Sequence, residues 1–361
     1  MLVSIIIFIL TLLVLVIIHE LGHFLMAKKF GIKVEEFGFG IPPRLFGKKI
    51  GETLYSLNAL PLGGFVRLLG EDEVDKTVLK NKRSFASQNV YKRILVVISG
   101  VTMNLFLAWI IFYTVIVYQN FKIIYPTPQP AVFIGFLEKG FPAEGAGVKI
   151  GDRILKVDEK EIKNFEDARN FIKEKNGGSV TLTLSDIDGQ SKRVVNVTPK
   201  KVETGFLIGV GFTPVAMKSY VRGVDKLFSG ITYSWQLTKV TFVGLGKLLG
   251  DVAAGNFKTA SEGVSGPVGL ARMSNDILSN GPSAAAFYLW FVGVISLTLS
   301  IFNVLPIPAL DGGRLLFLVI EAASRKKVRE DIERLVHQIG FAVLLTLALL
   351  ITYSDISKLI H

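Results

Sequence analysis

Long apolar runs separated by charged loops dominate this chain. The runs at residues 2–27, 94–118 and 284–305 each reach the length of about 20 residues that a transmembrane helix needs. A fourth run at 339–353 is shorter and reaches that length only if Leu335 and Val336 extend it. Half of all residues are apolar, which is high for a soluble domain. We therefore predict a multi-pass α-helical membrane protein with four transmembrane helices.

Lysine and arginine indicate how these helices are oriented. The loop at 28–93 contains thirteen of them, the loop at 311–335 six, and the tail after residue 353 one. Because short cytoplasmic loops collect positive charge, we expect both loops in the cytoplasm and both termini outside, with residues 119–282 extracytoplasmic. No basic helix with interleaved aromatic residues occurs, so we expect the lipid bilayer, and no nucleic acid, as a partner.

The extracytoplasmic stretch contains one candidate soluble domain. Residues 130–202 alternate strand patterns with two short helical segments, and the run "FPAEGAGVKIGDRI" within them resembles the PDZ domains of bacterial proteases. We therefore expect one inserted α+β PDZ domain. It separates an N-terminal membrane part (1–118) from a membrane-associated amphipathic linker region (203–282) and a C-terminal membrane part (283–361).

The first apolar run ends in an ionisable cluster, "HELGH". His19 and His23 lie four residues apart and so share one face of a helix, where two imidazoles can bind one metal ion. Glu20 lies on the adjacent face, where it can act as a general base toward a metal-bound water. Such a pattern also arises by chance in soluble proteins. Ionisable residues inside a membrane helix are costly, however, and this favours a functional site.

A catalytic zinc site usually needs a third protein ligand. The chain has no cysteine, and its two other histidines are His337 and His361. A carboxylate is the better candidate, and "NVLPIPALDGG" at 303–313 supplies Asp311 at the end of the third apolar run. Two prolines should end that helix, and Gly312-Gly313 should let the chain turn tightly beside the site. The alternative is that Asp311 is an ordinary aspartate of a loop or helix cap.

Taken together, these motifs resemble the site-2 protease family of intramembrane zinc metalloproteases. Within it, the chain resembles the bacterial branch that cleaves membrane-bound anti-sigma factors and signal-peptide remnants. The resemblance covers nearly the whole chain and includes "GFG" at 38–40, "PLGGFVRL" at 61–68 and "SGPVG" at 265–269. One departure lies in the second span, which reads "SGVTMN" at 99–104, with Val101 where the family usually has proline.

The resemblance implies a bacterial cytoplasmic (inner) membrane protein with one Zn2+ near the cytoplasmic side. Its substrates would be single-span membrane proteins, some of them first cut by a site-1 protease. The metal hypothesis also constrains the topology. If the apolar stretch Leu227–Leu249 crossed the membrane, Asp311 would lie on the opposite side from His19 and His23. We therefore predict that this stretch, which Lys239 and Lys247 interrupt, does not span.

Two further groups of residues are candidates for contacting the substrate. The loop 33–70 has strand-like stretches set off by glycine and proline, and we expect a re-entrant β-rich membrane loop whose edge pairs with an extended substrate. Its glycines also fit ordinary hairpin turns. Asn303 is a candidate for oxyanion stabilisation or substrate binding, although a hydrogen bond between helices would explain it equally well. The candidates in the loop are Gly38, Phe39, Gly40, Gly63 and Gly64.

Three other functions compete with intramembrane proteolysis. A membrane-anchored PDZ scaffold with a structural metal would have no need of a base at Glu20. A metal-ion transporter would need polar residues along the spans, and the first span offers only Ser4 and Thr11 before His19. A protease of soluble proteins at the membrane face would accept an unfolded soluble substrate equally well. The sequence leaves open whether the PDZ domain binds a new C-terminus or excludes bulky substrates.

Overall fold

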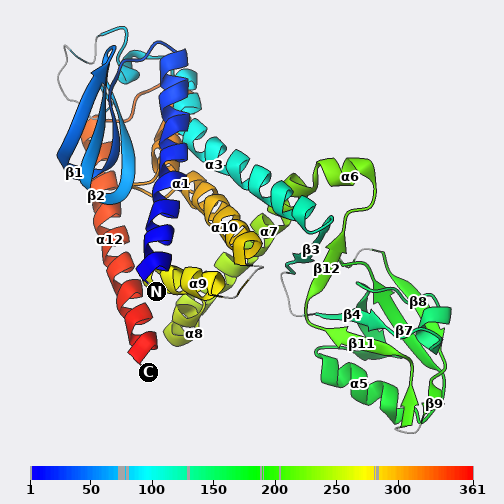
Figure 1. Ribbon diagram of the computed structural model, residues 1–361. Helices are drawn as coiled ribbons and strands as arrows, with labels where there is room; N and C mark the ends of the chain where they lie inside the picture. The colour runs from blue at the N-terminus through cyan, green and yellow to red at the C-terminus, as the bar shows by residue number, and fades with distance from the viewer. Residues whose placement is uncertain are drawn as a thin grey trace. The chain divides into compact units, whose positions relative to one another are not determined.

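A computed structural model describes residues 2–71, 78, 81–127, 131–187, 189, 191–202, 205–279, 281 and 284–360. His361, one of the four histidines, lies outside these residues. The chain divides into two compact units (Figure 1). The first unit combines Met1–Val115 with Asp251–His361, and the second is Ile116–Gly250.

Within the described residues, four helices are long and apolar enough to cross a membrane. They are α1 (Leu2–Lys29), α3 (Val90–Tyr118), α10 (Ala284–Val304) and α12 (Glu330–Ile360). The first three agree with the prediction to within a few residues. The fourth is longer than the predicted 339–353, because the apolar helix continues through Val336 and Leu335. Helix α7 (Ser229–Ala253), which contains most of the stretch predicted not to span, is not among the four.

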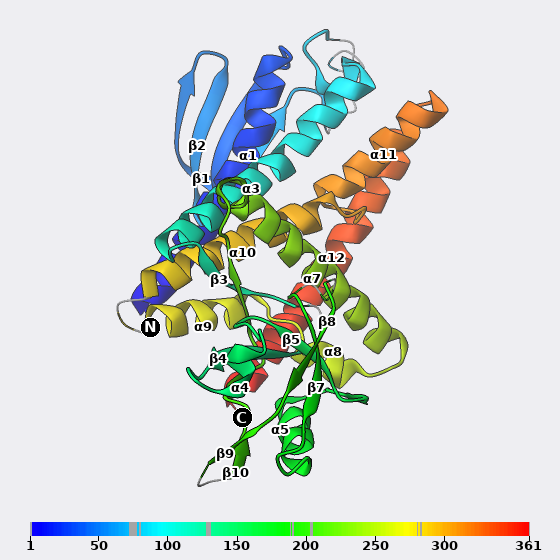
Figure 2. The ribbon, with the colours of Figure 1, turned by 90° about the vertical axis from the view of Figure 1, so that its right-hand side faces the viewer.

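The predicted β-rich loop forms an antiparallel sheet of two long, bent strands, β1 (Val34–Ile50) and β2 (Thr53–Leu68). The first part of β1 lies between two parts of β2, since Phe37 pairs with both Tyr55 and Val66. The second part of β1 then pairs again with the start of β2, as in Lys48 with Tyr55. The end of β2, residues 64–68, is therefore an edge of the sheet within the described residues. Figures 1 and 2 show the sheet lying along α1.

Shorter helices complete the first unit: η1 (Phe85–Ser87), α8 (Phe257–Glu262), α9 (Pro267–Leu278) and α11 (Asp311–Ser324). Helix α10 is tied to α3 by two hydrogen bonds, from Ser296 Oγ to the Asn104 carbonyl (2.8 Å) and from Ser300 Oγ to the Val101 carbonyl (3.0 Å). Helix α3 continues through Val101 without a break, as expected where valine replaces proline.

The second unit contains an antiparallel sheet in the order β11-β4-β5-β7-β8, with β6 pairing β5. Strand β7 alternates buried and half-exposed residues over 180–184. Helix α5 begins where the Asn164 side chain accepts a hydrogen bond from the Asp167 N–H (2.8 Å). The sheet extends past the predicted domain end at residue 202, because β11 pairs with β4.

The elements of the second unit are β3 (Lys122–Tyr125), β4 (Val132–Leu137), α4 (Pro142–Gly145), β5 (Arg153–Val157), β6 (Lys160–Glu161), α5 (Phe165–Glu174), β7 (Val180–Ser185), β8 (Arg193–Val197), β9 (Lys200–Val202), β10 (Gly205–Leu207), β11 (Val210–Thr213), β12 (Ala216–Ser219), α6 (Gly223–Leu227) and most of α7. β12 pairs with β3, and Tyr233 of α7 donates from its hydroxyl to the Ile124 carbonyl (3.2 Å).

Candidate metal centre

The site begins with a close approach of two apolar helices. Gly22 of α1 faces the backbone of Ser99 and Gly100 on α3, so closely that a Cβ on Gly22 would overlap it. A Cβ on Gly100 would in turn lie 2.6 Å from Cε1 of His23 and 2.9 Å from Cε1 of His19. The two imidazoles of α1 therefore lie directly against the backbone of α3, and both residues are buried.

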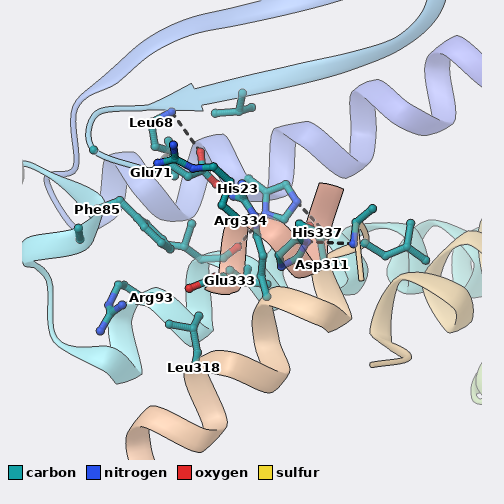
Figure 3. Close-up of a pocket in the computed structure, with 18 of the residues that line it drawn as sticks. His23, Leu68, Glu71, Phe85, Arg93, Asp311, Leu318, Glu333, Arg334 and His337 are labelled. Carbon is teal, nitrogen blue, oxygen red and sulfur yellow. Dashed lines mark hydrogen bonds and ion pairs between the residues drawn. The ribbon is translucent and has the colours of Figure 1, made fainter. Parts of the chain in front are cut away.

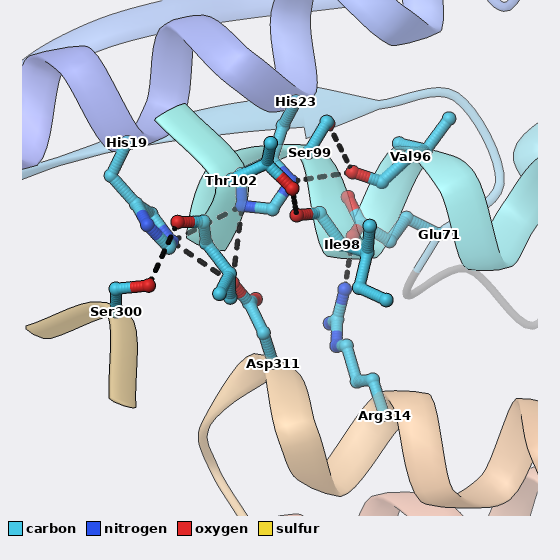
Figure 4. Close-up of polar contacts among 11 residues, drawn as sticks. His19, His23, Glu71, Val96, Ile98, Ser99, Thr102, Ser300, Asp311 and Arg314 are labelled. Carbon is cyan, nitrogen blue, oxygen red and sulfur yellow. Dashed lines mark hydrogen bonds and ion pairs between the residues drawn. The ribbon is translucent and has the colours of Figure 1, made fainter. Parts of the chain in front are cut away.

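The three predicted ligands converge in the structure (Figure 4). Nε2 of His19 lies 2.9 Å, and Nε2 of His23 3.2 Å, from the same carboxylate oxygen of Asp311. The two Nε2 atoms are 3.2 Å apart. Residues that are almost three hundred positions apart in the sequence thus present three donor atoms to one point.

The hydrogen bond made by Nδ1 of His23 leaves Nε2 as the nitrogen that can bind a metal ion. Nδ1 of His23 lies 2.8 Å from the carbonyl oxygen of Val96 on α3. A carbonyl only accepts hydrogen bonds, so Nδ1 must be the donor. In the neutral ring, Nε2 then carries a bare lone pair directed at His19 and Asp311. A backbone carbonyl that orients a metal-binding histidine in this way is the usual arrangement in metalloproteins.

These distances fit a tetrahedral zinc ion. Zinc ligands lie about 2.0–2.1 Å from the ion, so two ligands of a tetrahedral site lie about 3.3 Å apart. The three observed separations of 2.9, 3.2 and 3.2 Å are close to this value. Two imidazoles and one carboxylate also form a typical donor set for catalytic zinc, which keeps one position open for water.

Asp311 reaches this point because of the loop before it. Helix α10 ends at Val304, ahead of the two prolines, and α11 begins at Asp311 itself. Gly312 and Gly313 therefore occupy the first turn of a helix, whereas the sequence suggested a turn of the loop. Their missing side chains serve the loop nonetheless, since a Cβ on either would overlap the backbone of residues 304–308. The loop folds back tightly on the start of α11 and brings the carboxylate to α1.

A cavity of about 930 Å3 opens beside His23 and Asp311 (Figure 3). Glu20, His23 and Asp311 all line it, so the predicted base shares one cavity with two of the predicted metal ligands. Glu20 also lies against β2, because a Cβ on Gly64 would be 3.6 Å from Cγ of Glu20. The edge segment of the sheet therefore runs directly past the predicted base.

The remaining sequence candidates belong to the sheet or to α10. Gly38, Phe39, Gly40 and Gly63 belong to the sheet but are not among the residues lining the cavity, and neither is Asn303. Gly40 and Gly63 have positive φ angles, of 78° and 89°, as expected at bends of the strands. Asn303 occupies the last turn of α10 and is half-buried. Gly64 is also absent from the cavity lining, but it lies next to Glu20.

Two ion pairs connect the elements around the cavity. Arg314 of α11 pairs with Glu71 just after β2, and Arg93 of α3 pairs with Glu321 of α11. The first of these pairs is drawn in Figure 4, and the cavity that both line is drawn in Figure 3. Sequence reasoning missed them, as it missed the Val96 carbonyl and the contact of Gly22 with Gly100. The only sequence signal was "SG" at 99–100, because small residues in an apolar helix allow another helix to pack closely.

The site combines two histidines and a carboxylate with a glutamate beside them, at the end of an apolar helix. This combination defines the chain as a metallohydrolase built into helices that can cross a membrane. The family model described as "Peptidase family M50" matches residues 7–347. The chain therefore belongs to peptidase family M50, the site-2 protease family of zinc metalloproteases, and the predicted family and enzyme class are confirmed.

Curated relatives match over nearly their full length. A Clostridium perfringens protein is 35% identical and covers 95% of each chain. The zinc metalloprotease RasP of Geobacillus kaustophilus is 31% identical over 98% of each chain. The regulator of sigma-W protease RasP of Bacillus subtilis is 28% identical over 96% of each.

Among solved structures, the PDZ domain of an SdrC-like protein from Listeria monocytogenes matches 24% of this chain and 93% of its own length, with 18% identity and a TM-score of 0.22. The PDZ assignment of residues 130–202 stays a prediction from the sequence.

Proposed function

We propose that this chain is an intramembrane protease in which His19, His23 and Asp311 hold one zinc ion and Glu20 is the general base. The observation that carries the proposal is the convergence of two imidazole nitrogens and a carboxylate oxygen, at 2.9–3.2 Å, next to a cavity that Glu20, His23 and Asp311 line. A structural metal site gains nothing from a base beside its ligands, which argues against the scaffold alternative.

The chemistry divides between the ion and the protein. A bound zinc ion supplies Lewis acidity and a nucleophilic water at neutral pH. Glu20 accepts a proton from the attacking water and delivers it to the leaving amine. Val96 holds His23 in the tautomer that binds metal, and the helices exclude lipid from the ligands while the cavity admits water. Asn303 stays a candidate for contacting the oxyanion or the substrate.

The edge of the β sheet supports recognition of an extended substrate. A peptide bond inside a helix is hidden by its hydrogen bonds, so the substrate must unwind before it is cut. Residues 64–68 of β2 form an edge of the sheet within the described residues, and this edge passes next to Glu20, where an extended chain can add as a further strand. Leu45, Phe46 and Ile50 of the same sheet are 69%, 65% and 58% exposed, as expected of a loop that enters the bilayer.

Single-span membrane proteins are the substrate class that we propose. One relative is named for regulating sigma-W, and we extend this to anti-sigma factors and signal-peptide remnants as substrates, first cut by a site-1 protease. The positive charge of the loops supports an inner-membrane protein with both termini and the PDZ domain extracytoplasmic, and with the site near the cytoplasmic side. The predicted parts 1–118, 130–202, 203–282 and 283–361 are our proposed organisation.

A cleavage assay with purified protein in detergent tests the proposal. We expect the wild type to cut a single-span substrate, Glu20→Gln to retain zinc while losing about 10²–10⁴-fold in kcat, and a chelator to abolish activity. Glu159→Gln, an exposed substitution in the second unit, is the matched control and should change nothing.

Each competing function predicts a different result. Unchanged proteolysis in Glu20→Gln would refute the proposed base. Equal cleavage of an unfolded soluble protein would identify a protease acting at the membrane face. Zinc flux into proteoliposomes without cleavage would identify a transporter.

A further inference from the structure

His337 of α12 contacts the loop that carries Asp311, although it is not one of the converging ligands. The backbone N–H of Ala309 donates a hydrogen bond to Nδ1 of His337, with an N–N distance of 2.9 Å. The donor can only be the amide, so Nδ1 must be unprotonated and act as the acceptor. His337 lines the same cavity as Glu20, His23 and Asp311, and Figure 3 shows it near Asp311.

The residue that His337 holds is in an unusual conformation. Ala309 has a φ angle of +75°, in the left-handed region that residues with a side chain rarely adopt. Such a conformation persists only where the surroundings enforce it. A half-buried N–H that lost its acceptor would favour a different loop conformation, because a buried donor without a partner is costly.

Two further contacts hold α12 against this loop and against helix α11, which follows it. One turn after His337, Gly340 faces Pro308 so closely that a Cβ would overlap it. The His337 ring also packs on Phe317 of α11, with ring centroids 5.9 Å apart. His337 is therefore clamped between the helix that begins with Asp311 and the loop that precedes it.

The loop transmits this restraint to the metal ligand over two residues. Leu310, which follows Ala309, donates from its N–H to the Ile307 carbonyl (3.2 Å) and accepts from the N–H of Gly313 (3.0 Å). Asp311 lies between these bonded residues, so the backbone torsions at Ala309 determine where its carboxylate points. A shift of Ala309 would move Asp311 away from His19 and His23.

We propose that His337 is a positioning residue for the third zinc ligand and acts on Asp311 through Ala309. This inference rests on the proposed function, because it takes Asp311 as a ligand. Its role is to keep the carboxylate preorganised, so its loss should weaken zinc binding and lower kcat, with little effect on KM. Partners of metal ligands typically contribute 10–100-fold in affinity or activity.

Two amide substitutions separate this role from simple packing. In His337→Asn, the side-chain oxygen can take the place of Nδ1 and accept from Ala309. In His337→Gln, the longer side chain places its oxygen where Nε2 was. We expect His337→Asn to retain zinc affinity to within a few-fold, and His337→Gln and His337→Leu to lose about 10-fold or more. Zinc affinity is measured by competition with a chromogenic chelator, and the cobalt-substituted protein reports the ligand geometry in its absorption spectrum.

The outcomes distinguish the inference from the function on which it rests. Asp311→Asn is included as a reference that should lose zinc. If Asp311→Asn loses zinc but His337→Gln and His337→Leu bind it as the wild type does, the positioning role is wrong and the proposed function stands. If Asp311→Asn itself retains zinc, the proposed ligand set is wrong. An equal loss in all three His337 variants, with unchanged unfolding in detergent, would also overturn the inference, because the Nδ1 position would then not matter.

Discussion

Substituting Gly100 with alanine should damage the metal centre from a helix that contributes no ligand. The new Cβ would lie 2.6 Å from Cε1 of His23 and 2.9 Å from Cε1 of His19. Two carbon atoms at contact need about 3.5 Å. The nearest ring atom, Nε2 of His23, would lie only 2.3 Å from the new Cβ. The rings or the helices must therefore move by about 1 Å, and in a packed interior such a strain costs about 1–3 kcal/mol.

The displacement acts on atoms that must meet at one point. A misplacement of about 1 Å can cost about 10²-fold in rate. We therefore expect Gly100→Ala to weaken zinc binding by about 10–100-fold and to lower kcat by a similar factor. Chelator competition measures the first effect, and cleavage of a single-span substrate at saturating zinc measures the second.

A matched control exists in another helix. Gly246 of α7 is also helical, but a Cβ there would meet no atom within 4 Å, so Gly246→Ala should leave zinc affinity unchanged. If Gly100→Ala bound zinc within about twofold of the wild type and kept its activity, the close contact between α3 and the histidines would not position the site, and our reasoning would fail.

Two further predictions concern stability. The backbone N–H of Thr181 (2.9 Å), and then the Lys175 ammonium (2.9 Å), hold the pKa of Asp158 below its ordinary value. Its stabilisation is therefore present above the unfolded pKa of about 3.9 and is lost as pH falls through the folded pKa. Asp158→Asn should therefore make the free energy of unfolding, measured by circular dichroism, depend less on pH in the acid range. An unchanged pH dependence would contradict this. Replacing Ser296 and Ser300 by alanine should cost about 1 kcal/mol in a detergent unfolding titration, since each bond between membrane helices contributes about 0.6 kcal/mol; no loss would show that these two bonds are not stabilising.

The local elements could be predicted because their signals are local. A run of apolar residues determines a membrane helix by its length, and the spacing of His19 and His23 places both on one face of that helix. The predicted fourth helix, 339–353, was too short. The helix begins at Glu330, but the charged residues before Leu335 interrupt the apolar pattern from which it was predicted. The soluble domain was predicted to end at residue 202, whereas β11 also belongs to its sheet. β11 joins the sheet by pairing with β4, which lies much earlier in the chain, and no local pattern indicates such a pairing.

The chemistry of the site was also within reach of the sequence. A chain without cysteine must bind zinc through histidine and carboxylate, and only one aspartate follows a helix-breaking pair of prolines at the end of an apolar run. The supporting residues were not predictable in this way. Val96 contacts His23 through its carbonyl, Gly100 makes room for the two imidazoles by lacking a side chain, and His337 contacts Ala309 through one nitrogen. No sequence motif indicates any of these contacts.

The sequence alone predicted which segments are long and apolar enough to cross a membrane and which side chains are candidate metal ligands, because apolar length and donor chemistry depend on residue type and short spacing. Tertiary structure decided where those donors meet and what holds them there. The contact of Gly22 with Gly100 and the bond from Ala309 to His337 join residues distant in the chain, and the folded-back loop brings Asp311 to His19 and His23. Such contacts arise only when helices pack, since they depend on the space left between backbones and on hydrogen-bonding groups that every residue carries.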